Sequence, residues 1–299
     1  MSEGKRYRGV DLVKVLMALV VVAIHTTEWK LGGLVRAAVP YFFIVSGYFL
    51  FRKLNGHQKD DLKTIRRWIF RILKMYLIWT AIYLPFTIYG FIQDDLSLKQ
   101  GIFVFGRNLL FVGQNFMSWP LWYLLSLIWC GVILYLFRLL RLPVWSALLL
   151  GIVFAVLPHF IGNNPYFLKV FRDADNPVFL GLLYVSIGGC IRQYRIQTPW
   201  WVGAIIAVAG FITLQFSLHA IPVLAIGLFL MALDLPLPFI SDATSLSFRN
   251  GSEAIYLVHM IFAGLLILLM GMENGWFLFG ITVAASSVVA WAYNRWIKC

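Results

Sequence analysis

Two ionisable residues, Lys14 and His25, share one face of the first long apolar segment of the chain. They are eleven positions apart, about three turns of a helix, so their side chains are expected to stand one above the other. Ionisable groups inside a membrane helix are costly and usually face a cavity or the protein interior. The pair therefore predicts a functional site in this helix.

Two acidic residues, Asp11 and Glu28, extend the same polar stripe. Asp11 is expected to pair with Lys14, and Glu28, three positions after His25, is expected to orient the imidazole or stabilise its charged form. An unperturbed histidine has a pKa of about 6.5 and can accept a proton from a hydroxyl at neutral pH. Two alternatives stay open: a histidine that only bonds a neighbouring helix, and a proton relay between Lys14 and His25.

The elements that must carry this stripe are membrane-spanning helices. The 299-residue chain is 61% hydrophobic and only 13% charged, whereas soluble domains are roughly 45–50% apolar and about 25% charged. The composition predicts an all-α membrane protein, folded as a polytopic bundle. A span needs about 20 apolar residues, and on this scale we expect about ten transmembrane helices, at 10–28, 37–53, 67–92, 119–139, 143–160, 178–194, 199–216, 218–234, 252–271 and 275–297. The segment 101–113 is too short to span and is expected to be re-entrant or interfacial.

The net charge of +12 follows the predicted topology and requires no nucleic-acid partner. Most of the 25 lysines and arginines fall in alternate loops, which places both termini in the cytoplasm by the positive-inside rule. The first segment lacks a signal-peptide cleavage site, so we expect it to remain as the first helix of a multi-pass protein of the cytoplasmic membrane. No internal repeat of the kind that builds many transporters is visible, which disfavours a carrier.

The sequence has no pattern typical of a metal site or a disulfide framework. Cys130, Cys190 and Cys299 are far apart and are expected to be packing residues. Asp173 and Asp175 have no further acidic partners nearby, so a solvated loop is expected there. The remaining histidines are expected in loops or at helix ends: His57, His159 and His219.

A second basic feature lies between the second and third predicted spans. Residues 52–74 carry eight basic residues against two acidic ones, and Arg67, Arg71 and Lys74 fall on one helix face at i, i+4 and i+7. A cationic face that enters the bilayer from the cytosol suits a phosphorylated ligand such as a nucleotide cofactor. An amphipathic stretch lying on anionic membrane lipids is the alternative.

Three further stretches complete the pattern. A run of proline, aromatic residues, serine and glycine occupies 39–50, a Pro-Leu-Trp-Tyr-Leu element occupies 120–124, and Ser-Glu-Ala-Ile-Tyr-Leu-Val-His occupies 252–259. Together with the Lys14 to His25 spacing, they resemble the acyltransferase-3 family of integral membrane acyltransferases over nearly the whole chain. Residues 39–50 and 120–124 are especially similar to the membrane domains of vancomycin-resistance serine racemases.

The resemblance implies a single transmembrane domain over residues 1–299 and an enzyme that moves an acyl group, with acetyl favoured. The donor would be cytosolic acyl-CoA, and the acceptor a hydroxyl of a cell-envelope glycan or lipid. His25 corresponds to the family's essential histidine and would act as general base, with a covalent acyl-histidine as the alternative. Lys14 stands where the family commonly has arginine, which replaces a bidentate phosphate contact by a point charge.

Further roles follow from the same hypothesis. The phosphates of acyl-CoA would dock on inner basic residues: Arg8, Lys14, Arg66, Arg67 and Arg71. Tyr123 or Ser46 would donate to the developing oxyanion, although either residue could serve only as a helix-packing hydrogen bond. His259, with Ser252 and Tyr256 on its face at i, i+4 and i+7, is expected to line the same cavity or to be structural.

The main rival function is a transporter or permease for a small amino acid or similar solute, with Lys14 and His25 as a proton relay. A membrane anchor is a third alternative, which such costly polar stripes disfavour. The chain ends at Cys299 directly after the last predicted span, so we expect either that it acts alone or that a fused enzyme domain has been removed. The sequence leaves open the acyl group, the acceptor and the oligomeric state.

Overall fold

The computed structural model describes residues 6–28, 34–171, 176–217 and 220–297. Helices are the only regular elements in these ranges, so the prediction of an all-α protein is confirmed. The described chain divides into two compact units, one formed by residues 1–42 and 197–299 and the other by 43–196. The expected single domain over 1–299 stays a prediction.

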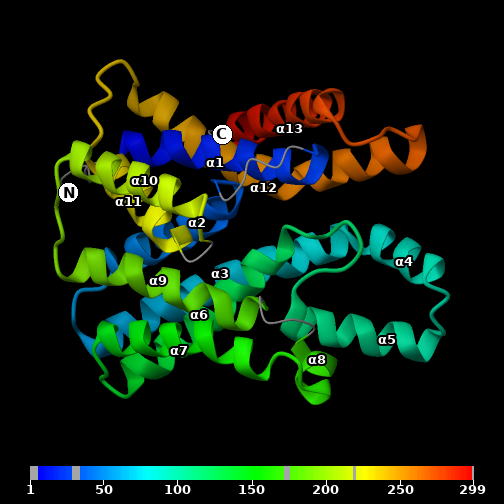
Figure 1. Cartoon of the computed structure of the whole chain (residues 1–299), viewed down its shortest axis with the longest axis horizontal. Helices are drawn as coiled ribbons and strands as arrows, with labels where there is room; N and C mark the ends of the chain where they lie inside the picture. The colour runs from blue at the N-terminus through cyan, green and yellow to red at the C-terminus, as the bar shows by residue number, and fades with distance from the viewer. Residues whose placement is uncertain (1–5, 29–33, 172–175, 218–219, 298–299) are drawn as a thin grey trace. The chain divides into compact units, whose positions relative to one another are not determined.

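Unit 1 is built around the first helix, α1 (Arg8–Thr26). Its buried apolar residues, among them Val10, Val13, Met17 and Val21, recur every three to four positions, as expected for one buried helix face. In Figure 1, α1 lies beside α12 and α13, and it also contacts α11. The other helices of the unit are the first part of α2 (Leu34–Phe51), α10 (Trp200–Leu214), α11 (Ile221–Asp234), α12 (Asp242–Met270) and α13 (Trp276–Ile297).

Unit 2 contains the second part of α2 and the helices that follow it. Among these, α6 packs against both α3 and α9, and α7 packs on α9. Gly47 and Gly188 let α2 and α9 approach closely, because a Cβ at Gly47 would clash with the Val185 carbonyl oxygen and one at Gly188 with that of Ile44. The helices of unit 2 after α2 are α3 (Gln58–Ile82), α4 (Leu84–Gln93), α5 (Leu98–Arg107), the π-helix η1 (Asn108–Val112), α6 (Leu121–Leu139), α7 (Val144–Ile161), α8 (Pro165–Phe171) and α9 (Pro177–Gln193).

Five of the described helices are long and apolar enough to cross a membrane, and a sixth span results if α3 and α4 form one broken span. Four shorter apolar helices, which include α9, α10 and α11, accompany them. The chain is therefore a helical membrane protein. The expected count of about ten spans and the cytoplasmic termini stay predictions.

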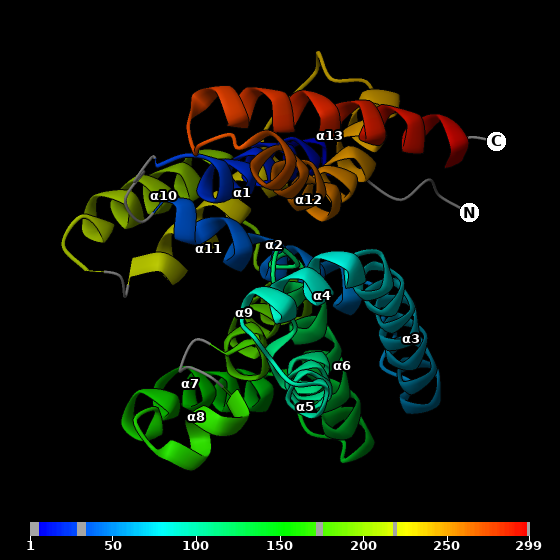
Figure 2. The ribbon, with the colours of Figure 1, turned by 90° about the vertical axis from the view of Figure 1, so that its right-hand side faces the viewer.

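Two predicted spans differ from the structure. The segment expected as one helix over 67–92 begins at Gln58 and bends by 52° between α3 and α4, a change of direction that Figure 2 shows. Pro85 stands in the first turn of α4, where its missing N–H and its ring interrupt the helix. The span expected from residue 252 begins at Asp242, because Ser241 caps the helix by accepting from the Thr244 N–H.

The short segment expected over 101–113 forms α5 followed by η1. The π-helix ends at Gly113, whose φ of 77° lies in the left-handed region, where glycine is favoured. Ser97 and Gln100 form a capping box at the start of α5. The whole segment is thus helical, and its place in the membrane stays a prediction.

Candidate functional site

The imidazoles of His25 and His259 stack on one another in unit 1. Their ring centroids are 5.5 Å apart and their planes differ by 22°. His25 lies in the last turn of α1 and is half-buried, whereas His259, midway along α12, is 0% exposed. The structure thus brings together the histidine expected to be catalytic and the one expected to line a cavity.

Local bonds determine the tautomer of His259. Its Nδ1 lies 2.8 Å from the carbonyl oxygen of Tyr256 and 3.2 Å from that of Ile255. Because a carbonyl oxygen only accepts, Nδ1 carries the proton and Nε2 of the neutral ring presents a lone pair. That Nε2 is buried and has no hydrogen-bond partner among the described residues. Such an unsatisfied buried acceptor is costly and suits a hydroxyl donor supplied by a ligand.

The end of α1 that carries His25 is anchored by two bonds at Thr26. The Thr26 carbonyl accepts from the Gly275 N–H at 2.8 Å, and the Thr26 hydroxyl donates to the Val22 carbonyl at 2.8 Å. The helix ends there, with Thr27 in an extended conformation. The expected helical i+3 position of Glu28 relative to His25 is therefore wrong, because Glu28 lies beyond the helix and is exposed.

At the other end of α1, two polar pairs join the helix to α12. Arg8 forms an ion pair with Asp242 at 3.0 Å, and the Ser245 hydroxyl donates to Asp11 at 2.6 Å. Arg8 was expected to hold a cofactor phosphate, and this carboxylate competes with that role. The partially exposed Arg8–Asp242 pair contributes little to stability, whereas the Asp11 bond is buried.

These contacts show that α1 and α12 run parallel in constant register. Both polar pairs join residues 234 positions apart, and the two histidines have the same separation. These contacts therefore lie toward the two ends of one helix–helix interface. This register makes the two histidines neighbours.

Lys14 lies on α1 between these two ends and is half-buried. The expected Asp11–Lys14 ion pair is wrong: no ion pair forms between these two described residues, because Asp11 faces α12 and accepts from Ser245. The carboxylates of Glu253 and Asp11 still attract the Lys14 ammonium electrostatically, and Arg249 repels it. Lys14 thus belongs to a mixed-charge cluster on α1 and α12.

The two expected cavity residues that accompany His259 on α12 are both buried. Tyr256 packs against His259, with ring centroids 6.2 Å apart, and against Phe42 at 5.7 Å. The Ser252 hydroxyl donates to the Arg249 carbonyl at 2.8 Å. Tyr256 therefore packs beside the histidine pair, while Ser252 bonds within its own helix.

In unit 2 the two oxyanion candidates bond to one another. The hydroxyl oxygens of Ser46 on α2 and Tyr123 on α6 are 2.9 Å apart, and the Tyr123 ring lies 4.7 Å from that of Phe43. The Ser46–Tyr123 bond links two helices, as the packing alternative expected.

The basic residues of α3 lie on its exposed side. The buried face consists of Asp61, Ile65, Trp68, Ile72 and Tyr76. The exposed residues include the expected phosphate contacts Arg66, Arg67 and Arg71. None of these three forms an ion pair with another described residue.

The other histidines, cysteines and acidic residues named in the sequence analysis belong to unit 2 or lie outside the described ranges. His57 and His159 are exposed, and Cys130 is buried. Asp173, Asp175, His219 and Cys299 lie outside the described residues. Within the described ranges, no group of three or more His, Cys, Asp or Glu residues could hold a metal ion.

Sequence reasoning missed Ser245 as the partner of Asp11. A signal for it existed, because Ser245, Ser252 and His259 recur at intervals of seven and all three are buried. Heptad spacing predicts one helix face against a partner helix. It does not say which helix that partner is.

Comparison with known proteins identifies the family of the chain. A family described as an acyltransferase domain matches residues 7–295. The chain belongs to the acyltransferase-3 family. No solved structure matches this acyltransferase-3 chain.

Curated relatives of the acyltransferase-3 chain are bacterial racemases. A serine/alanine racemase of Enterococcus gallinarum is 27% identical over 214 residues, which are 62% of this chain and 29% of that protein. One amino-acid racemase of Enterococcus faecalis is 28% identical over 38% of this chain and 17% of its own length. A second one is 24% identical over 64% of this chain and 29% of its own length. The chain thus spans less than a third of these relatives, and the expected similarity to such racemases is confirmed.

Proposed function

We propose that this membrane protein is an O-acyltransferase that moves an acyl group, acetyl in the first instance, from cytosolic acyl-CoA to a hydroxyl of a cell-envelope glycan or lipid. The observation that carries the proposal is the stacked His25–His259 pair with a buried, unpartnered Nε2 on His259. Membership of the acyltransferase-3 family supports the reaction class.

The reaction assigns each ring a separate task. A neighbouring hydroxyl of the acceptor donates a hydrogen bond to His259 Nε2, which positions the acceptor, and His25 removes the proton of the reacting hydroxyl as general base. The oxygen attacks the thioester carbonyl carbon, a C–O bond forms and the C–S bond breaks. The proton held on His25 passes to the departing CoA thiolate, so the products are the ester and CoA-SH.

The donor would enter along the opposite end of the same helix. Lys14 and His25 are separated by about 16 Å along α1, at about 1.5 Å per residue, a span suited to the pantetheine arm of CoA. Lys14 would contact phosphate near the cytoplasmic end. The phosphate-binding role expected of the exposed α3 residues Arg66, Arg67 and Arg71 stays a prediction. Arg8 would have to leave Asp242 to take part.

Transport of a small amino acid is the second candidate function. The similarity to proteins named serine/alanine racemase favours it, because their membrane part would then serve an amino acid. In that case Lys14 and His25 would relay protons and no thioester would be consumed.

The test is thioester loss from acetyl-CoA by the full chain in lipid nanodiscs. Wild type is compared with His25→Ala and with His159→Ala, a matched control that removes an exposed histidine from α7. Loss of a general base lowers the rate by roughly 10²–10⁴-fold, so we expect that fall in His25→Ala and wild-type rates in His159→Ala.

Two results would reject the proposal. Equal rates in wild type and His25→Ala would remove the base from the reaction. Absence of any acetyl-CoA turnover, together with proton-coupled serine uptake in proteoliposomes, would replace acyl transfer by transport.

A further inference from the structure

A cavity of about 390 Å³ lies within unit 2, and its lining includes none of the residues proposed above for acyl transfer. It is formed where α2, α6 and α9 end and their loops lead to the next helices. The sequence predicts these three loops to be cytoplasmic. The cavity volume falls in the range of small-molecule pockets, about 300–1,000 Å³.

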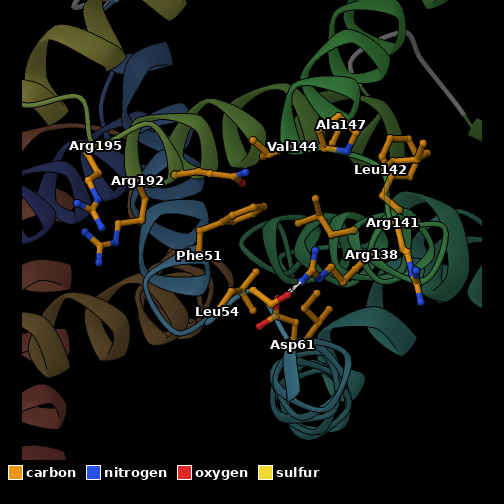
Figure 3. A pocket seen from close by; sticks show the side chains of 16 residues that line it. Phe51, Leu54, Asp61, Arg138, Arg141, Leu142, Val144, Ala147, Arg192 and Arg195 are labelled. Carbon is orange, nitrogen blue, oxygen red and sulfur yellow. Dashed lines mark hydrogen bonds and ion pairs between the residues drawn. The ribbon is translucent and has the colours of Figure 1, made fainter. Parts of the chain in front are cut away.

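Four arginines line this cavity, and Figure 3 shows where they lie. Arg138 and Arg141 come from the end of α6. Arg192 and Arg195 come from the end of α9, and their two side chains lie side by side. Asp61 is the only acidic residue in the lining. With four positive charges and one negative, the lining carries a net charge of +3.

The single carboxylate is already occupied. Asp61, whose side chain is 3% exposed, forms an ion pair with Arg138 at 2.8 Å and accepts from the Asn55 backbone N–H at 2.9 Å. Among the described residues, no carboxylate forms an ion pair with Arg141, Arg192 or Arg195. The buried Nε of Arg138 has no hydrogen-bond partner there either. The cavity therefore has an excess of donors and positive charge.

The frame around these arginines is held by hydrogen bonds. The Gln58 side-chain amide donates to the Leu139 carbonyl at 2.8 Å and to the Arg138 carbonyl at 3.1 Å, and its oxygen accepts from Arg141 Nε at 3.3 Å. The first residue of α3 is thus tied to the last turn of α6. This network makes the cavity a preformed site.

The remaining wall is apolar and partly aromatic. It includes Phe51, Leu54, Ile65, Leu134 and Phe137. A ligand that fills the cavity must therefore pair an anionic group with an apolar or aromatic one. Guanidinium groups match phosphate oxygens in bidentate geometry, which points to a phosphate ester.

We propose that this cavity binds a phosphate ester joined to an apolar or aromatic group on the cytoplasmic side. Two sources share this chemistry: a soluble nucleotide, and the headgroup of an anionic phospholipid, which is enriched in the cytoplasmic leaflet. The site is separate from the exposed arginines of α3 and does not depend on acyl transfer at His25.

The test measures binding by the full chain, first in neutral detergent with adenosine 3′,5′-bisphosphate, then in nanodiscs with and without phosphatidylglycerol. The pocket variant Arg192→Gln/Arg195→Gln is compared with Lys59→Gln/Lys63→Gln, which removes the same charge from exposed α3 positions outside the cavity. Since Arg195 is exposed, the single variant Arg195→Gln serves as a second measurement that does not endanger folding.

Saturable binding of the nucleotide that weakens at least about tenfold in the pocket variant alone supports the site and identifies a soluble ligand. Phosphatidylglycerol that remains bound to wild type in native mass spectra, and is lost from the pocket variant alone, supports the site and identifies a lipid. The proposal is overturned if neither probe distinguishes the pocket variant from wild type, or if the two double variants lose binding equally.

Discussion

The proposed division of labour between the two histidines predicts the outcome of a double-mutant cycle. In His259→Asn, the amide N–H can still donate to the Tyr256 carbonyl, which lies 2.8 Å from Nδ1 in the native protein. The variant lacks the acceptor at the buried Nε2 position and the ring that stacks on His25. Thermal unfolding of the variant therefore reports the loss of packing, and turnover reports the loss of the acceptor.

The magnitudes follow from the bonds that each change removes. A hydrogen bond from a neighbouring acceptor hydroxyl to Nε2 contributes about 0.5–1.5 kcal/mol, so His259→Asn should lower kcat/KM roughly 2- to 12-fold. His25→Asn removes the base and should lower kcat/KM roughly 10²–10⁴-fold. Since His259 positions the acceptor for proton transfer to His25, the His259 change should add almost nothing once His25 is absent.

The assay is release of the CoA thiol by the full chain in nanodiscs over a range of concentrations of a hydroxyl acceptor. Thermal unfolding of each variant is measured beside it, and His159→Asn is the matched surface control. Wild-type activity in His259→Asn would refute the role of Nε2. Multiplication of the two single effects in the double variant would show that the rings act independently.

Three other predictions test the framework around these sites. Asp61→Ala should lower the free energy of unfolding by about 2–4 kcal/mol, because it breaks the ion pair between buried Asp61 and Arg138, which is 26% exposed. Denaturation in detergent measures this loss, and Asp60→Ala, at the exposed neighbouring position, should show little change. Equal losses in the two variants would contradict a stabilising role for the Asp61–Arg138 pair. Gly188→Leu should leave no folded protein in size-exclusion chromatography, because even a Cβ at this position meets the Ile44 carbonyl oxygen. Gly280→Leu, in open space, should be tolerated. A monodisperse Gly188→Leu protein would count against the close approach of α2 and α9. Ser46→Ala and Tyr123→Phe should each lower the free energy of unfolding by about 1 kcal/mol. The double variant should lose no more than either single variant, and additive losses would mean that the two hydroxyls do not act as a pair.

Local sequence signals predicted most of the helices and failed where a single residue or cap decided the boundary. Hydropathy cannot distinguish a continuous span over 67–92 from two helices that meet at a 52° bend, although Pro85 was visible in the sequence. The cap at Ser241 extends α12 beyond the apolar run that predicted it. Glu28 was assigned to the helical face although α1 ends at Thr26, because periodicity continues to count turns after a helix has stopped.

The sequence by itself determined that this protein is an all-helical membrane protein of the acyltransferase-3 family and that Lys14 and His25 share one helix. Composition and 3.6-residue periodicity are local properties, and they are sufficient for the helices and for the shared helix face, while the motifs carry the family resemblance. Only the tertiary structure decided that α12 runs parallel to α1 in the register that stacks His259 on His25. It also decided that arginines from separate helices line one cavity. Such contacts depend on how side chains pack between segments far apart in the chain, which no local pattern specifies.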